Sequence, residues 1–225
     1  MKQTITTFLT SEKGIYIDAL VLVSIPTIIL LISTPFLDLV ICVLLVLIYS
    51  WLQGGIGKNL GFLKPDKPGK LFLQSLGIAF VFFISTAIIG LVLTSLTGVP
   101  HDLSAFEAMR GNLAVYIPTL AIGWVVGGFI EEVLFRAFMI KKINRLLGGK
   151  PIANVLAALL PAIFFGFLHA YQGLIGQILA GLIGLALAVL YIKNKHNTWQ
   201  NVLVHGLFDT IAITTVYLNL DRMFG

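Results

Sequence analysis

The stretch Gly128-Phe129-Ile130-Glu131-Glu132-Val133-Leu134-Phe135-Arg136 places two adjacent carboxylates and an arginine inside an apolar run. Most other charged residues of the chain lie at the ends of apolar segments or in the loops between them. Burying one charged side chain in lipid costs about 2.5–3.5 kcal/mol on insertion scales. These three charges therefore need partners inside the membrane, and the partners have to come from the other apolar segments.

The composition is that of a polytopic membrane protein. Of 225 residues, 58% are hydrophobic and 11% are charged, whereas a soluble domain is about a quarter charged. One membrane span needs about 20 apolar residues. We predict an all-α, polytopic transmembrane helical bundle of about seven spans, at residues 15–33, 37–52, 71–96, 113–140, 152–168, 174–192 and 199–218.

The basic residues predict the orientation of this bundle. With seven spans, twelve lysines and arginines fall on the amino-terminal side and two fall on the other side. Cytoplasmic loops carry an excess of Lys and Arg, so we expect a cytoplasmic amino terminus and read the basic clusters as topology signals rather than as nucleic-acid sites. The twelve are Lys2, Lys13, Lys58, Lys64, Lys67, Lys70, Lys141, Lys142, Arg145, Lys150, Lys193 and Lys195, and the two are Arg110 and Arg222.

The two glutamates are expected to have different roles. Neighbouring residues of an α-helix point about 100° apart, so Glu131 and Glu132 cannot share one environment. Glu132 and Arg136 are four residues apart with the acid first, which favours an ion pair along the helix. Glu132 then serves as scaffold, and Glu131 is the better candidate for chemistry. Asp18, near the start of the first span, is expected to be interfacial.

Polar residues on two other spans are the expected partners of Glu131. His169 ends the fifth apolar segment, four residues after Phe165, and His205 and Asp209 lie four apart in the seventh, on one face of a helix. Counted at about 1.5 Å per residue from the nearest cytoplasmic lysines, Glu131 and His205 both lie about 15 Å deep. An antiparallel hairpin that turns at residues 148–149 would bring His169 to the same depth.

Such a set of side chains suits the activation of water. Glu131 could act as a general base without a metal. Alternatively, Glu131, His169, His205 and Asp209 could hold zinc or another divalent metal, whose bound water has a pKa near 7. The chain contains no His-Glu-x-x-His, no Gly-x-Ser-x-Gly and no phosphate-binding glycine motif. We therefore expect hydrolysis within the membrane and no nucleotide or organic cofactor.

The ordered set Glu131-Glu132-x-x-x-Arg136, Phe165-x-x-x-His169 and His205-x-x-x-Asp209 resembles the CPBP family of intramembrane proteases, also called the Abi or CAAX protease and bacteriocin-processing family. The resemblance covers residues 113–219, a core of four spans. Residues 1–112 contribute three further spans and a cytoplasmic loop to the same membrane domain. Asp209 stands where the family's prenyl endopeptidases have Asn.

The resemblance implies a membrane endopeptidase in which Glu131 activates water and His169 and His205 are catalytic or metal-binding residues, with Asp209 beside them. Glu132, Arg136 and Phe165 would support them. It also implies a peptide or protein substrate, prenylated or of the bacteriocin or signal-peptide kind, and a place in the bacterial plasma membrane, in bacteriocin processing or self-immunity. Two alternatives stay open: a non-catalytic immunity protein and a proton-coupled transporter.

Overall fold

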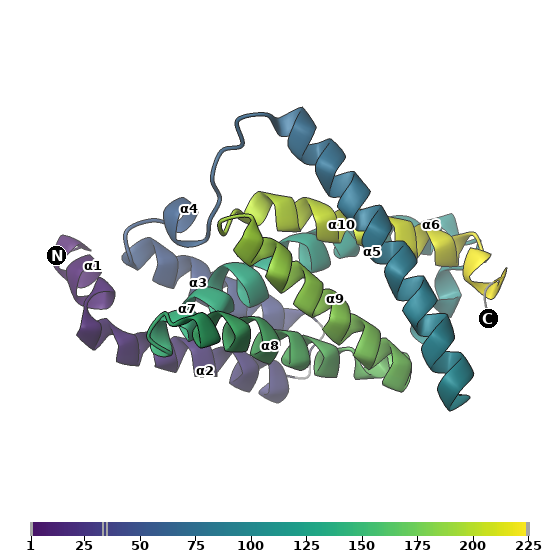
Figure 1. The fold of residues 1–225 in the computed structure, drawn as a ribbon, viewed down its shortest axis with the longest axis horizontal. Helices are drawn as coiled ribbons and strands as arrows, with labels where there is room; N and C mark the ends of the chain where they lie inside the picture. Colours follow the sequence, from purple (N-terminus) through teal and green to yellow (C-terminus); the bar gives the residue numbers. More distant parts are fainter. Residues whose placement is uncertain (1, 33, 35, 224–225) are drawn as a thin grey trace.

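The protein is helical throughout the part that its structure, a computed structural model, describes, namely residues 2–32, 34 and 36–223. Those residues contain no β-strand. Figure 1 shows long helices packed side by side, with the two termini at opposite ends of the longest axis. In chain order the elements are α1 (Lys2–Thr10), η1 (Glu12–Gly14), α2 (Ile15–Leu31), α3 (Leu37–Leu52), α4 (Ile56–Asn59), α5 (Pro68–Thr97), η2 (Ser104–Met109), α6 (Leu113–Ile122), η3 (Gly123–Ile140), α7 (Lys141–Leu146), α8 (Pro151–Leu168), η4 (Ala170–Gln172), α9 (Gly173–Lys193), α10 (Thr198–Tyr217) and η5 (Leu220–Met223).

All seven segments predicted as spans are helices. Within the described residues, five helical stretches are long and apolar enough to cross a membrane. Of the other two predicted spans, α3 is apolar but shorter, and α10 carries the polar residues of the candidate site. The count of seven spans and the cytoplasmic amino terminus therefore stay predictions. The predicted end of the first span, at residue 33, lies outside the described residues. The five stretches are residues 12–31, 68–97, 113–146, 151–168 and 170–193.

The fourth predicted span is not a plain α-helix. It starts as α6, continues as the π-helix η3 and ends as α7 without interruption. Backbone hydrogen bonds of a π-helix run from residue i to i+5, which makes the helix wider than an α-helix, and π-helical turns are frequent at functional sites. Hydropathy indicates an apolar helix but not its hydrogen-bonding step. The α-helical angle expected between Glu131 and Glu132 therefore does not apply here.

The predicted hairpin between the fourth and fifth spans is present. The chain reverses at Gly148 and Gly149, whose φ angles of 75° and 70° lie in the left-handed region that favours glycine. α7 and α8 then pack against each other, and α8 continues along η3. α8 runs through Pro161 without a break, and a 3-10 turn (η4) separates it from α9, which crosses the bundle at a tilt (Figure 1).

α8 and α9 pack closely through small residues. A Cβ atom added to Gly166 would lie 2.8 Å from the carbonyl oxygen of Gln177, and one added to Gly184 would lie 3.3 Å from the Cα of Ala162. Small residues at a helix contact let two backbones approach. Gly184, one of four small residues spaced four apart on α9, therefore packs against α8 within the chain. The four are Gly176, Ala180, Gly184 and Ala188.

The tip of the hairpin is fastened to the amino-terminal helices by Asp18. Its side chain is fully buried, and it forms ion pairs with Lys142 and Arg145 of α7. Tyr49 and Gln53 also donate hydrogen bonds to it, at 2.8 and 3.2 Å. These partners are distant in sequence and replace water around the carboxylate, which sequence spacing did not indicate. The expected position of Asp18 at the membrane interface stays a prediction.

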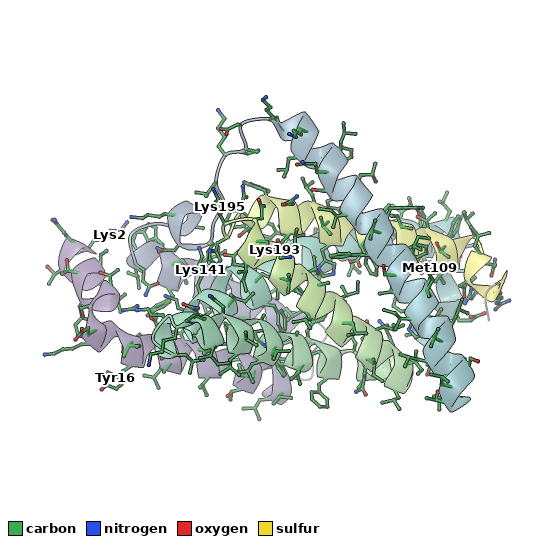
Figure 2. The ribbon with its side chains drawn as sticks, in the orientation of Figure 1. Lys2, Tyr16, Met109, Lys141, Lys193 and Lys195 are labelled. Carbon is green, nitrogen blue, oxygen red and sulfur yellow. The ribbon has the colours of Figure 1, made fainter. Side chains whose placement is uncertain are left out.

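Most of the basic side chains labelled in Figure 2 lie toward the amino-terminal end of the molecule. Lys2, Lys141 and Lys195 are on the side of the view that holds the amino terminus, Lys193 is near the middle, and Met109 is on the other side. This placement agrees with the clustering of basic loops on which the predicted orientation depends.

Candidate functional site

The ion pair predicted from sequence lies at the centre of the site. Arg136 Nη1 donates to Glu132 Oε1 at 2.7 Å, and the two side chains are 2% and 0% exposed. Arg136 Nη2 also donates to the carbonyl oxygen of Gly184 on α9, at 3.2 Å. The guanidinium lies over the ring of Phe165, 4.9 Å from its centre. A buried charge pair is tolerated only when such further contacts satisfy it.

Glu132 is more than scaffold, because it also holds His205. The Nδ1 atom of His205 lies 2.7 Å from Glu132 Oε1, the oxygen that also accepts from Arg136. A carboxylate paired with arginine can only accept hydrogen bonds, so His205 carries a proton on Nδ1 and donates it. This contact assigns the orientation of the imidazole and directs its Nε2 atom away from Glu132.

Two further carboxylates lie near that Nε2 atom. Glu131 Oε2 is 3.9 Å from it and Asp209 Oδ1 is 3.7 Å from it. Both distances are too long for a direct hydrogen bond and leave room for a bridging group such as water. The side chains of Glu131 and Asp209 are 16% and 21% exposed, against 6% for His205. The structure thus places two partly accessible carboxylates in front of a buried, oriented imidazole.

Glycines allow η3 and α10 to bring these groups together. A Cβ atom on Gly127 would lie 2.4 Å from Asp209 Oδ2 and 3.5 Å from His205 Nε2. One on Gly206 would collide with the ring of Trp124, whose Nε1 donates to Thr210 at 3.0 Å. Any larger side chain at Gly127 would therefore displace the Asp209 carboxylate. Gly127 lies four residues before Glu131 and Gly206 directly follows His205, so their positions next to the motif residues are a usable signal.

His169 lies at the edge of this arrangement. Its Nδ1 atom is 2.8 Å from the carbonyl oxygen of Phe165, which can only accept, so Nδ1 carries the proton. Its ring packs 4.5 Å from the Phe165 ring, and Phe165 packs 6.2 Å from His205. Among the described residues, no hydrogen bond or ion pair joins His169 to Glu131, His205 or Asp209. The ring of Phe165 therefore packs near both histidines.

The predicted metal ligands do not form a ligand group in this arrangement. Over the described part of the chain, no set of three or more His, Cys, Asp or Glu side chains is placed to hold a metal ion. The donor types themselves would suit zinc. A divalent metal at Glu131, His169, His205 and Asp209 stays a prediction.

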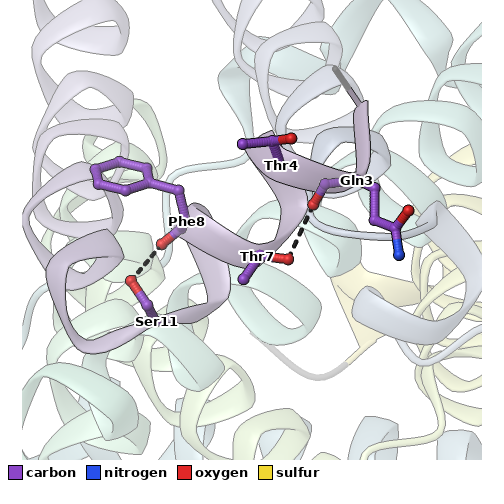
Figure 3. A pocket seen from close by; sticks show the side chains of 5 residues that line it. All are labelled: Gln3, Thr4, Thr7, Phe8 and Ser11. Atoms are coloured by element: carbon purple, nitrogen blue, oxygen red, sulfur yellow. Dashed lines mark hydrogen bonds between the residues drawn. The ribbon is translucent and has the colours of Figure 1, made fainter.

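One surface hollow lies away from this site. It has a volume of about 590 Å³ and is formed by Gln3, Thr4, Thr7, Phe8 and Ser11 along one helix, as Figure 3 shows. Thr7 and Ser11 donate to backbone carbonyl oxygens of the same segment, at 2.9 and 2.6 Å. The described residues that line this hollow are uncharged, and none belongs to the predicted site.

Fold and site together define an integral membrane protein with carboxylates gathered around a histidine between its helices. Residues 113–211 match the family described as Type II CAAX prenyl endopeptidase Rce1-like, which is the CPBP family. This match confirms, over residues 113–211, the resemblance to the CPBP family that the motifs indicate. No curated protein and no solved structure matches the chain.

The matched family is one of CAAX-type intramembrane proteases, which implies a peptide or protein substrate in a lipid context. The matched segment begins with α6 and ends within α10, so it contains every residue of the site described above.

Proposed function

We propose that the chain is an endopeptidase that hydrolyses a peptide bond of a membrane-associated peptide or protein, and that Glu131 activates the attacking water. We further propose that residues 113–219 carry the catalytic machinery and that residues 1–112 support it. The observation that carries this proposal is the arrangement at His205: Glu132 holds its Nδ1, while Glu131 and Asp209 face its Nε2 at 3.9 and 3.7 Å.

The roles of the two glutamates follow from their partners. Glu132 has its oxygens occupied by donors from Arg136, His205 and Asn201, so it is a poor base. Glu131 has no such set of donors among the described residues and is partly accessible. A general base must reach the proton that it removes and must be free to accept it. Glu131 meets both conditions, and Glu132 keeps His205 in place.

In the proposed reaction, Glu131 takes one proton from a water molecule that lies between it and His205. The water oxygen bonds to the carbonyl carbon of the scissile peptide. When the carbon–nitrogen bond breaks, Glu131 returns that proton to the leaving nitrogen, so that a carboxyl product and an amine product form. His205 accepts a hydrogen bond from the water through its Nε2 atom and so orients it, Asp209 assists His205, and His169 acts beside them at the edge of the site. Proton transfer by a positioned side chain contributes about 10²–10⁴-fold to a rate.

The cellular setting is also a proposal. We infer a bacterial plasma membrane with the amino terminus inside, and a substrate that is prenylated or of the bacteriocin or signal-peptide kind. Asp209 supports a substrate different from that of the prenyl endopeptidases, because it adds a charge where they have Asn. The zinc prediction is tested by metal analysis of the purified protein together with cleavage assays with and without a chelator.

The proposal is tested by cleavage of membrane-embedded peptides by the purified protein in liposomes. Glu131→Ala and His205→Ala are expected to abolish product formation while the protein still folds and inserts. His169→Ala is expected to do the same. Glu107→Ala is the matched control, because this carboxylate lies on the exposed η2 turn and pairs with Arg110 and Arg222. Wild-type cleavage by all three site variants would overturn the enzyme proposal.

A further inference from the structure

We propose that Asn201 is a positioning residue of this site: it holds Glu132 so that Glu132 can hold His205. The inference rests on the proposed peptidase function for its kinetic consequence, but its structural consequence can be measured without any activity. Asn201 lies on α10, four residues before His205, and its side chain is completely buried. It is not part of the motifs that carry the family resemblance.

Both donor hydrogens of the Asn201 amide are in use. Its Nδ2 atom donates to Glu132 Oε2 at 3.1 Å and to the carbonyl oxygen of Leu187 at 2.8 Å. Both partners can only accept, which assigns the NH₂ end of the amide to this side. The Oδ1 atom is buried without a hydrogen-bond partner among the described residues. A buried acceptor left unpaired is costly, so it is the donor end that this asparagine contributes.

Asn201 completes the set of donors around Glu132. Arg136 and His205 both bind Oε1, and Asn201 binds Oε2. Without Asn201 the second oxygen would have no donor within the described structure. A carboxylate held at one oxygen can rotate, and rotation would move Oε1 away from His205 Nδ1. The proton on Nδ1 would then lose its acceptor, and His205 would no longer be restricted to one tautomer and one orientation.

α9 anchors this arrangement. Arg136 and Asn201 each use a second N–H to bind a backbone carbonyl of α9, at Gly184 and at Leu187 respectively. α9 supplies neither Glu131 nor His205, so it acts as a fixed support on which η3 and α10 are aligned. Arg136 fastens η3 to it, and Asn201 fastens α10 to it, in both cases beside Glu132.

The kinetic test compares Asn201→Leu and Asn201→Asp with Gln200→Leu. Leucine has a similar volume and no donor, and aspartate places an acceptor against Glu132. Loss of an outer partner of a catalytic group typically costs about 10–100-fold in activity. We expect a fall of that size in kcat for Asn201→Leu, a larger fall for Asn201→Asp, and an unchanged KM in both. Gln200 is a buried amide on the same helix, and no contact joins it to Glu132 within the described residues, so Gln200→Leu should keep wild-type kcat.

The structural test uses nitrogen NMR of protein labelled with ¹⁵N at its four histidines, with His205→Gln to assign the signal of His205. In the wild type we expect His205 to carry its proton on Nδ1. In folded Asn201→Leu the His205 signals should shift toward a mixture of tautomers, while those of His101, His169 and His196 stay unchanged. An unchanged His205 spectrum, with kcat lowered only in proportion to the folded fraction, would overturn the inference. If no substrate is cleaved but the spectrum shifts as described, the proposed function fails and the positioning role stands.

Discussion

The buried charges around Asp18 and those around Glu132 differ in how completely their carboxylates are satisfied. At the amino-terminal end, Asp18 receives donors from Tyr49, Gln53, Lys142 and Arg145. Each of its oxygens is occupied, and its side chain is 0% exposed. We call this the closed cluster, because its carboxylate has no free oxygen with which to bind a reactant. It joins α2 and α3 to α7.

The carboxylates of the candidate site, which we call the open cluster, are only partly satisfied. Glu132 resembles Asp18, because donors from Arg136, His205 and Asn201 occupy it. Glu131 and Asp209 differ from Asp18. His205 Nε2 lies 3.9 and 3.7 Å from their carboxylate oxygens, too far for a hydrogen bond, and their side chains are partly exposed. Burial of a charged side chain is therefore not enough to indicate a catalytic role. A saturated carboxylate supports the fold, and an unsaturated one next to an oriented histidine is available for a reaction.

The largest effect on both fold and function is expected from Arg136→Leu. Removing one partner of a buried pair typically costs about 3–5 kcal/mol, because an uncompensated charge is left behind. Glu132 would lose its cation, and cleavage would be lost with it. Thermal unfolding and cleavage on the same preparation measure both effects. Lys150→Leu, at an exposed lysine, should change stability by less than about 0.5 kcal/mol. An Arg136→Leu protein as stable as wild type would break the account of the open cluster.

The closed cluster should affect stability alone. Asp18→Asn leaves Lys142 and Arg145 without their carboxylate, but Arg145 is 31% exposed and can regain water. We therefore expect a smaller loss, about 2–3 kcal/mol. The kcat of the folded protein should equal that of wild type, because Asp18 has no contact with the site. Unfolding curves measure the loss of stability, and cleavage assays with active-fraction titration measure kcat. A lowered kcat in fully folded Asp18→Asn would show that the closed cluster also affects the reaction.

Asp209→Asn tests whether the open cluster needs the negative charge of Asp209. The substitution keeps the shape and removes the charge, and it restores the residue found in the prenyl endopeptidases that the motifs resemble. We expect kcat/KM to change by less than about tenfold, since a polar group still faces His205. Asp209→Leu should reduce it much further. Equal activity of the Asn and Leu variants would show that Asp209 takes no part in the reaction.

The smallest effect concerns a third cluster, at the opposite end of the molecule from Asp18. Arg110 forms ion pairs with Glu107 and Asp221, and it lowers the pKa of both carboxyls below their ordinary values. A lowered carboxyl pKa in the folded state contributes stability above the ordinary pKa, about 4, and this stability is lost as pH falls through the folded-state value. The unfolding temperature of Asp221→Asn should therefore be lower than that of wild type at pH 7, and the difference should shrink below about pH 4.

The control for this pH series is Asp66→Asn, at an exposed carboxylate of the loop before α5. It should follow the wild type at every pH. A constant difference between Asp221→Asn and wild type down to pH 3 would show that the ion pairs at Arg110 contribute nothing that depends on pH.

The helices of this fold could be predicted from sequence better than the contacts between them. Apolar length was enough to find all seven helical segments, and four-residue spacing was enough to find the Glu132–Arg136 pair. The hydrogen bond from His205 to Glu132 could not be found in this way, because it joins residues 73 positions apart. The same holds for Asp18 with Lys142, since local spacing carries no information on which helices pack together.

Asn201 is an intermediate case. Its spacing of four residues from His205 places it on the same helix face, so a systematic search of that face would have found it. Its partners, Glu132 and Leu187, lie on two other helices and require the packed bundle. The wider η3 helix also could not be predicted, because its composition is that of an ordinary apolar helix.

The most direct test of the central claim is Glu131→Gln, measured for cleavage and thermal unfolding on one liposome preparation. The substitution keeps the size of the side chain and removes its ability to take a proton. The account predicts a fall in kcat of about 10²–10⁴-fold with an unfolding temperature equal to that of wild type. Retention of wild-type kcat by a folded Glu131→Gln protein would contradict the assignment of Glu131 as the base.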